Sequence, residues 1–227
     1  NVNRHDSIFK PECDLQKEYE RAFKENKYNV VYVSSTNFDR LFSLYHAAIK
    51  AHRPFYVDLY QKRIMDVVAG RDSIWGKSAL YRYVDGNEPK TLKKQGSDFV
   101  VSDKFKNFTS EQGYVIIARQ GKHFDNLLSR LPDEGRVKYL SMWEGYIDES
   151  NAAYNQALAM SVGDNYRHMH TSGHCDMKSL EELITVLNPY AIIPIHTDNP
   201  QAFADLFSDK WPVILLNDGD SFSAIKD

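Results

Sequence analysis

Four histidines with spacing suited to chemistry lie close together in the C-terminal part of the sequence. His168 and His170 are two positions apart on a predicted strand, so they share one face of it. His174 follows a Ser172-Gly173 turn before a predicted helix, and His196 ends the next predicted strand. Parallel α/β sheets bind ligands at the carboxyl edge, where we expect these two strand ends to meet. Imidazole is suited both to zinc binding and to proton transfer near neutral pH.

A single histidine of this kind is more often structural or simply exposed than functional. Two of them at consecutive strand-to-helix turns, His174 and His196, favour a functional site. One possible arrangement is a self-contained zinc site, for which the sequence offers six side chains: His168, His170, His174, Cys175, His196 and Asp198.

Four polar residues precede a predicted helix near the start of the chain: Ser34, Ser35, Thr36 and Asn37. Their hydroxyls, the free backbone amides and the helix dipole can bind phosphate. Arg40 could add a bidentate phosphate contact. From the sequence alone, a plain helix cap is favoured for the four residues, and a solvated surface arginine is at least as good an interpretation of Arg40.

Other groups could contact nucleic acid, but a simpler interpretation is favoured for each. The lysines between Lys90 and Lys106 are the only local basic excess and could line an RNA path, although a solvated loop is the expected role. Trp75, Trp143 and Tyr146 could stack on bases. We expect core packing for all three.

Short apolar runs alternate with amphipathic segments along most of the chain. A strand at 30–33, a helix over 38–49 beginning with a Thr36-x-x-Asp39 capping box, a strand at 55–57 and a helix over 59–68 predict parallel βαβ units. Residues 85–113 are expected to be irregular, with one short strand near 99–101. The remaining expected elements are helices at 14–27, 123–131, 152–160, 177–187 and 202–207, strands at 114–118, 137–141, 166–170 and 191–195, and a closing hairpin that turns at Asp218-Gly219. The predicted fold class is α/β with a mostly parallel sheet.

The composition excludes several classes of protein. The 227 residues contain 28 Lys and Arg against 31 Asp and Glu, a net charge of −3, so the chain lacks the positive field of a protein that coats nucleic acid. The two cysteines, Cys13 and Cys175, are not part of a Cys-x-x-Cys pair, and a reducing, cytoplasmic compartment is expected. No apolar run approaches the ~20 residues that span a bilayer. The chain begins Asn-Val-Asn, without Met or an apolar signal core, which predicts an excised or processed chain.

Three stretches carry a resemblance to a known family: His170-Thr171-Ser172-Gly173-His174, Ile193-Pro194-Ile195-His196-Thr197-Asp198, and Asp218-Gly219-Asp220. With His196 22 positions after His174, they resemble the C-terminal signature of β-CASP metallo-β-lactamase-fold nucleases, the family of ribonuclease J and the RNA 3′-processing endonucleases. The stretches from Val33 to Arg40 and from Ser141 to Tyr146 resemble two strand-to-helix turns of the β-CASP insert.

The principal metal motif of that family, His-x-His-x-Asp-His, is absent from the sequence, together with the family's further His and Asp ligands. In the family these belong to an N-terminal metallo-β-lactamase half that precedes the insert. The resemblance therefore implies a fragment, with a β-CASP-like domain over residues 12–163. Residues 164–227 would be the C-terminal segment of the metallo-β-lactamase-like domain, in the region of the RNA-specificity motif.

The resemblance also implies roles for individual residues. By position, His196 resembles the last zinc ligand, and His174 resembles the proposed general acid that protonates the leaving oxygen of a phosphodiester. His170 and Ser172 resemble groups that hold the substrate phosphate. Two zinc ions are implied in the intact protein, whereas this chain alone is expected to bind zinc weakly or not at all. Thr197-Asp198 stands where the family commonly has Gly-Glu.

The sequence thus predicts a portion of a zinc-dependent phosphodiester hydrolase that processes RNA. The fragment would supply two active-site histidines and a substrate clamp that includes Ser34, Ser35, Asn37 and Arg40. Its expected partners are RNA or another phosphodiester and the missing lactamase half, with no membrane. Two alternatives stay open: a non-catalytic module that binds nucleic acid, and a protein with a self-contained zinc site.

Overall fold

The structure is a computed structural model that divides into two compact units, Lys10–Thr171 and a second unit from Ser172 onward. We describe each unit by itself. The predicted domains, 12–163 and 164–227, stay a prediction. The residues that the structure describes are 10–69, 81–83, 98–99, 103–150, 158, 160, 163, 165–172, 175, 177–197 and 199–223.

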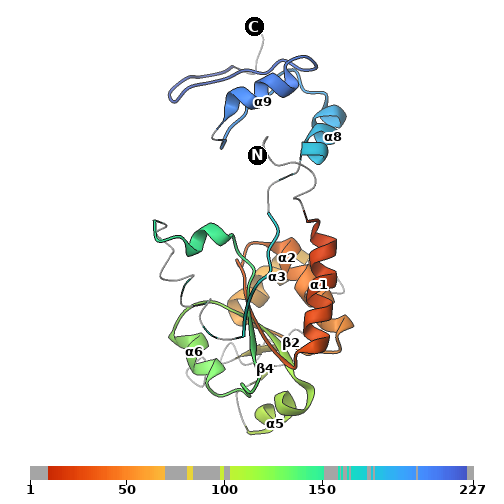
Figure 1. The fold of residues 1–227 in the computed structure, drawn as a ribbon, viewed down its shortest axis with the longest axis vertical. Coiled ribbons are helices and arrows are strands. Elements are labelled where there is room, and N and C mark those ends of the chain that lie inside the picture. Colours follow the sequence, from red (N-terminus) through yellow and green to blue (C-terminus); the bar gives the residue numbers. More distant parts are fainter. Residues whose placement is uncertain are drawn as a thin grey trace. The chain divides into compact units, whose positions relative to one another are not determined.

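A parallel sheet forms the centre of the first unit (Figure 1). Its strands are β1 (Tyr28–Tyr32), β2 (Phe55–Asp58), β3 (Tyr81–Tyr83), β4 (Asp98–Phe99), β5 (Tyr114–Ala118), β6 (Val137–Leu140) and β7 (Tyr166–His168). They follow the order β4-β3-β2-β5-β1-β6-β7, and every pairing between them is parallel. At the centre, Val30 is in register with Ile116 on one side and Lys138 on the other. The predicted α/β class with a parallel sheet is confirmed.

Helices cover both faces of this sheet, because its central strands are buried on both sides. The helices are α1 (Glu12–Glu25), α2 (Phe38–Lys50), α3 (Leu59–Ala69), α5 (Asp103–Gln112) and α6 (Lys122–Leu128), followed by the 3₁₀ helix η3 (Glu144–Ile147). One core cluster joins α1, α2 and Met65 of α3 to Val31, Val57 and Ile117. A second cluster lies on the other face of the sheet. It joins Phe105 of α5 and Leu127 of α6 to Val30, Tyr56 and Ile116 of the same strands.

Two local expectations for the first unit are wrong. The segment 85–113 is not wholly irregular, since α5 fills its end. The sequence shows no clear apolar periodicity for this helix, because its only buried residues are Phe105 and Thr109. The cap of α2 is Asn37, whose side-chain oxygen accepts a hydrogen bond from the Arg40 backbone N–H at 3.2 Å. Thr36 stands one position too early and pairs its hydroxyl with that of Ser34 instead.

The second unit contains α8 (Met177–Leu187) and α9 (Pro200–Phe207), as expected. The strand expected at 191–195 is reduced to a single parallel bridge between Ile192 and Val213. The predicted turn at Asp218-Gly219 forms, with Gly219 at φ 91°, but the described part of the expected hairpin contains no strand. Most of the helix expected at 152–160 lies outside the described residues. No helix in the described ranges is long and apolar enough to cross a membrane.

Candidate functional site

Arg40 lies at the carboxyl edge of the sheet and connects four segments of the first unit. Its side chain, in the first turn of α2, is 1% exposed. Nε and Nη2 donate to the two carboxylate oxygens of Glu12, at 2.8 and 2.9 Å. Nη1 donates to the hydroxyl of Ser141 and lies 3.4 Å from Nδ1 of His170, and Nη2 also donates to the Thr171 carbonyl oxygen.

These contacts engage all five N–H donors of the guanidinium group, counting the ring nitrogen of His170 as an acceptor. A buried arginine needs this full set, because an unpaired charge in a low dielectric is costly. Arg40 is therefore not the solvated surface arginine that the sequence allowed. Its role as a phosphate contact stays a prediction, and it would require one of these hydrogen bonds to open.

His170, two residues after the end of β7, is held in its neutral form. Burial lowers its pKa, and the positive charge of Arg40 lowers it further, to about 4. If Nδ1 accepts from Arg40, the single ring proton lies on Nε2, which leaves that atom as the donor. The neighbouring His168 places Nε2 2.8 Å from the Met142 carbonyl oxygen and faces His170 with ring centroids 6.1 Å apart.

The turn from Ser34 to Asn37 leads from β1 into α2 and has local hydrogen bonds of its own. The Asn37 backbone N–H donates to the Ser34 carbonyl oxygen at 3.2 Å, and the Asn37 side chain caps α2. Ser34 and Thr36 are exposed. Asn37 thus serves as the helix cap that the sequence favoured for this segment, while phosphate binding by Ser34, Ser35 and Asn37 stays a prediction.

Two aromatic side chains are exposed at the turn after β6, contrary to the expected core packing. Trp143 is 54% exposed and Tyr146 38%, and their rings contact edge to face with centroids 5.5 Å apart. A Cβ atom on Gly145 would lie 2.3 Å from the Trp143 ring, so this position must be glycine for the ring to lie where it does. Trp75 lies outside the described residues. The exposed pair follows Ser141, which contacts Arg40 directly.

A second arginine at the same sheet edge was not identified from the sequence. Arg119, directly after β5, forms an ion pair with Asp58 at the end of β2 and donates to the Ser35 hydroxyl at 3.0 Å. Asp58 also accepts from the Gln61 backbone N–H at 2.7 Å. The available signal was positional, because Asp58 ends one buried parallel strand and Arg119 directly follows another.

The histidines of the second unit are only partly described. His174, the predicted general acid, and Asp198 lie outside the described residues. His196 adopts a left-handed backbone conformation with φ 55° after the Ile192 bridge, and Ser172 opens the unit. No group of three or more His, Cys, Asp or Glu side chains in the described ranges could hold a metal ion. Since zinc requires three or four ligands, the described residues do not form a zinc site by themselves.

The sequence matches one family model, described as the Zn-dependent metallo-hydrolase RNA specificity domain, over residues 162–216. This range contains His170, His174 and His196. Over this stretch the chain is similar to the β-CASP and metallo-β-lactamase proteins, in agreement with the histidine pattern. The match sets the chain in a metallo-hydrolase context, in a family described as dependent on zinc.

A solved structure shares the fold. It is the crystal structure of a protein of unknown function from Enterococcus faecalis V583, with a TM-score of 0.63 and 15% sequence identity. The alignment covers 92% of this chain but 44% of that one, so this chain corresponds to less than half of the larger protein. At this identity the likeness shows the fold alone. No curated protein matches the sequence.

Proposed function

We propose that this chain is part of a cytoplasmic, zinc-dependent phosphodiester hydrolase that processes RNA. The first unit would act as the substrate clamp, and the second would supply two active-site histidines. The observation that carries the proposal is the family match over 162–216, because it contains the predicted general acid His174 and the predicted zinc ligand His196.

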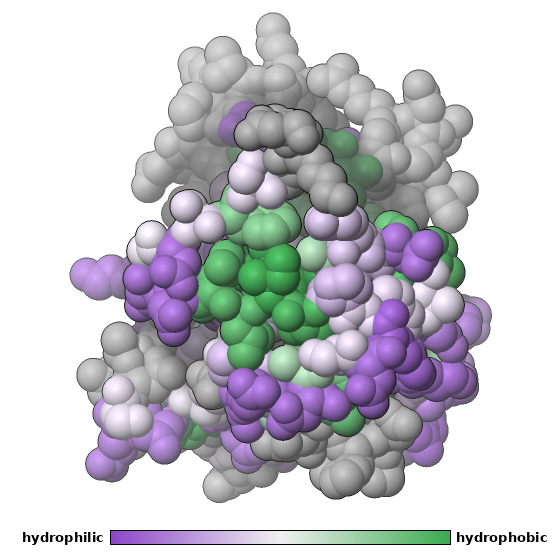
Figure 2. All heavy atoms as spheres, turned by 90° about the horizontal axis from the view of Figure 1, so that it is seen from above, coloured by the Kyte–Doolittle hydropathy of each residue, from purple (hydrophilic) through white to green (hydrophobic). Residues whose placement is uncertain are grey.

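The surface of the second unit supports a larger intact protein. Only Ile184 of α8 is buried, whereas its apolar residues Leu183, Val186 and Leu187 are 52%, 82% and 65% exposed. Ile195, before His196, is 81% exposed. Figure 2, seen from above the view of Figure 1, shows apolar side chains gathered in a patch with hydrophilic residues around it. Apolar surface of this kind marks a contact site, and we assign it to the lactamase half.

In the intact protein, that half would contribute the remaining metal ligands. His196 is the ligand that the family pattern assigns to this chain, and His174 would donate a proton to the leaving oxygen. His170 and Ser172 would hold the substrate phosphate. Because the low pKa of His170 keeps it uncharged at neutral pH, it would do so as a neutral N–H donor through Nε2.

The first unit has groups that suit RNA at the carboxyl edge of its sheet, where Arg40 lies. The exposed rings of Trp143 and Tyr146 follow the strand that ends beside Arg40, and such rings stack on bases without sequence preference. Ser34, Ser35 and Asn37 could bind phosphate from the neighbouring turn after β1. With a net charge of −3, the chain would rely on a few local contacts, so its affinity for RNA should be modest and sensitive to salt.

The test separates the two histidines in the intact protein. His174→Ala should lower RNA cleavage by about 10²–10⁴-fold with zinc content unchanged, because it removes a proton donor. His196→Ala should lower both cleavage and zinc content. His52→Asn is the matched control, since this exposed turn histidine has φ 54°, which Asn tolerates, and it should change neither.

Zinc analysis of the 227-residue chain after dialysis discriminates the alternatives. The proposal requires well under one zinc per chain. One tightly bound zinc would favour the self-contained site instead. Equal zinc loss in the His174 and His196 variants of the intact protein would contradict the division of roles, and RNA binding without cleavage in the presence of zinc would favour the non-catalytic module.

A further inference from the structure

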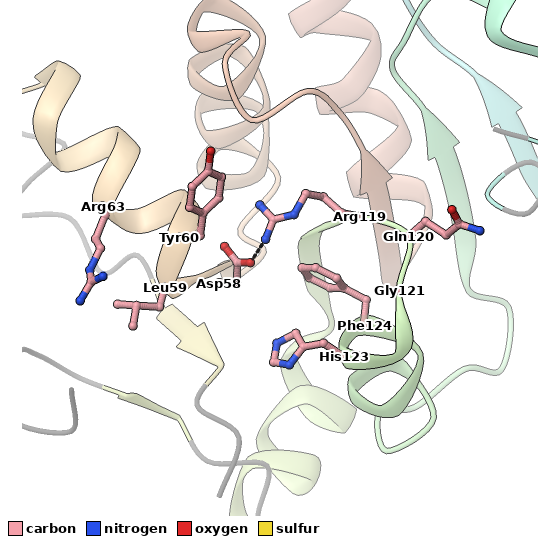
Figure 3. Close-up of a pocket in the computed structure, with 9 residues that line it drawn as sticks. All are labelled: Asp58, Leu59, Tyr60, Arg63, Arg119, Gln120, Gly121, His123 and Phe124. Carbon is pink, nitrogen blue, oxygen red and sulfur yellow. Dashed lines mark hydrogen bonds and ion pairs between the residues drawn. The ribbon is translucent and has the colours of Figure 1, made fainter. Parts of the chain in front are cut away.

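A pocket of about 470 Å³ opens at the carboxyl ends of β2 and β5, within the first unit (Figure 3). It is lined by residues from the end of β2 and the start of α3, and by residues from the turn after β5 and the start of α6. Pockets that hold small molecules fall in this range of volume. None of the groups assigned above to catalysis or zinc lines it.

The sheet topology places this pocket where α/β proteins bind ligands. β2 and β5 are neighbours, but the chain leaves them toward opposite faces of the sheet. Met65 of α3 packs in one core cluster, whereas Phe124 and Leu127 of α6 pack in the other. Such a change of side between adjacent parallel strands opens a crevice at their carboxyl ends.

Arg119 is held at the pocket by several contacts and still has free donors. Besides Asp58 and the Ser35 hydroxyl, its guanidinium lies over two rings, 4.9 Å from the centroid of Tyr60 and 5.3 Å from that of Phe124. Its side chain nevertheless remains 34% exposed. Two of its five N–H donors are engaged, which leaves three without an acceptor among the described residues.

An aromatic ring lies next to this arginine, and a second arginine lines the same pocket. Tyr60 is 56% exposed, so part of its ring surface is open although Arg119 lies over it. Arg63 lies one turn further along α3, is exposed, and has no hydrogen bond or ion pair within the described part of the chain. The carboxylate of Asp58 is already neutralised by Arg119.

We propose that this pocket binds a nucleoside phosphate, with the phosphate on Arg119 and the base stacked on Tyr60. A guanidinium fork matches phosphate oxygens in geometry and charge. An open aromatic ring beside it adds affinity for a ligand that carries a planar base, and inorganic phosphate carries none. Arg63 contributes positive charge at the pocket wall. The inference goes beyond the proposed hydrolase activity and does not depend on zinc.

Calorimetric titration of the 227-residue chain with AMP, and separately with inorganic phosphate, tests the pocket. We expect AMP to bind more tightly than phosphate. Tyr60→Leu should weaken AMP about fivefold or more, because it removes stacking, and should weaken phosphate much less, because Asp58 and Ser35 still hold Arg119. Arg63→Gln should weaken both ligands, and Arg119→Lys, which keeps the charge for Asp58 but loses the fork, should weaken both about tenfold.

Matched controls are available at exposed positions that do not line the pocket. Tyr190→Leu removes an exposed tyrosine of the second unit, and Arg130→Gln removes an exposed arginine after α6. Both should bind AMP like the parent chain. Equal affinity for AMP and phosphate, or a Tyr60→Leu variant that binds AMP like the parent, would overturn the proposal.

A competition experiment distinguishes the source of the nucleotide. If a 5′-phosphorylated hexaribonucleotide displaces AMP from the parent chain, the pocket takes an RNA end. If it does not, the pocket takes a free nucleotide, and both results are consistent with nucleoside phosphate binding. Absence of AMP binding, in an intact protein that still cleaves RNA, would refute this inference alone and leave the proposed function standing.

Discussion

Replacing Glu12 with Gln removes the charge that neutralises the buried Arg40. The substitution loses one of two charge-assisted hydrogen bonds, at 2.8 and 2.9 Å, and turns an amide donor toward the guanidinium. Breaking a buried pair costs about 3–5 kcal/mol. The Glu12 side chain is 30% exposed against 1% for Arg40, so solvent screens part of this loss. We therefore expect the free energy of unfolding to fall by about 2–3 kcal/mol.

A double-mutant cycle isolates the pair. Arg40→Met removes the buried charge, and in that background Glu12→Gln should cost less than about 0.5 kcal/mol, because no partner is left unpaired. Urea unfolding followed by far-ultraviolet circular dichroism gives all four stabilities. If Glu12→Gln costs the same small amount with and without Arg40, the buried ion pair does not join α1 to the sheet edge as described.

The same variants should move the pKa of His170 in opposite directions. Arg40→Met removes a positive charge and should raise this pKa from about 4, but not fully to 6.5, because burial is the larger cause. Glu12→Gln removes a charge that raises it and should lower it further. Histidine signals in an NMR titration report both shifts. Unchanged values in both variants would show that burial alone sets the pKa.

The folded-state pKa of His170 also gives a sign for the pH dependence. Because this pKa lies below that of the unfolded chain, the unfolded state binds more protons between pH 6.5 and about 4. The stability that neutral His170 contributes is therefore complete above pH 6.5 and is lost as the pH falls toward 4. Arg40→Met should weaken this loss.

Two further predictions concern backbone space and the apolar surface. Gly113→Ala should destabilise the chain by about 3 kcal/mol, because φ is 71° and a Cβ would lie 2.3 Å from the Lys27 carbonyl oxygen. The control Gly135→Ala, where φ is 75° but the space around a Cβ is open, should cost only about 1 kcal/mol. Thermal unfolding measures both costs, and equal values would contradict this account. Val186→Asp should reduce binding of a hydrophobic dye by the 227-residue chain but lower the stability of the intact protein. The control Val67→Asp, at a position 84% exposed on α3, should leave the stability of the intact protein unchanged. An intact protein that tolerates both substitutions equally would argue against a covered face at Val186.

The sequence predicted the sheet well because buried parallel strands are short, β-branched and apolar throughout. The run at 30–33 and the run at 114–118 fall on β1 and β5, with an offset of one or two residues at most. The strand expected at 191–195 does not form, because its apolar residues lack neighbouring strands that cover them. Its residues are apolar, but it forms one bridge with Val213, and Ile195 is largely exposed. An apolar run specifies a strand only where neighbouring strands cover it.

The contact partners of the site residues were harder to predict than the places of these residues in the fold. Arg40 was recognised as a candidate from its place in the first turn of a predicted helix, yet Glu12, the residue that neutralises it, lies 28 positions earlier on a different helix. Nothing in the local pattern links the two. Trp143 was expected in the core, but its ring lies at the surface, where only a glycine at position 145 leaves room for it. Both outcomes depend on tertiary contacts that spacing does not encode.

The two arginines at the carboxyl edge show why a complete count of donors is more informative than residue type. Both follow a strand, both pair with a carboxylate and both contact a serine hydroxyl. Arg40 has every N–H engaged by protein acceptors and is 1% exposed, so a ligand gains a donor from it only by breaking a native contact. Arg119 is held by Asp58, Ser35 and two rings but keeps three donors without an acceptor among the described residues, beside an exposed ring. A phosphate group therefore finds a preorganised partner at Arg119 without cost to the fold, whereas at Arg40 it would have to compete with Glu12.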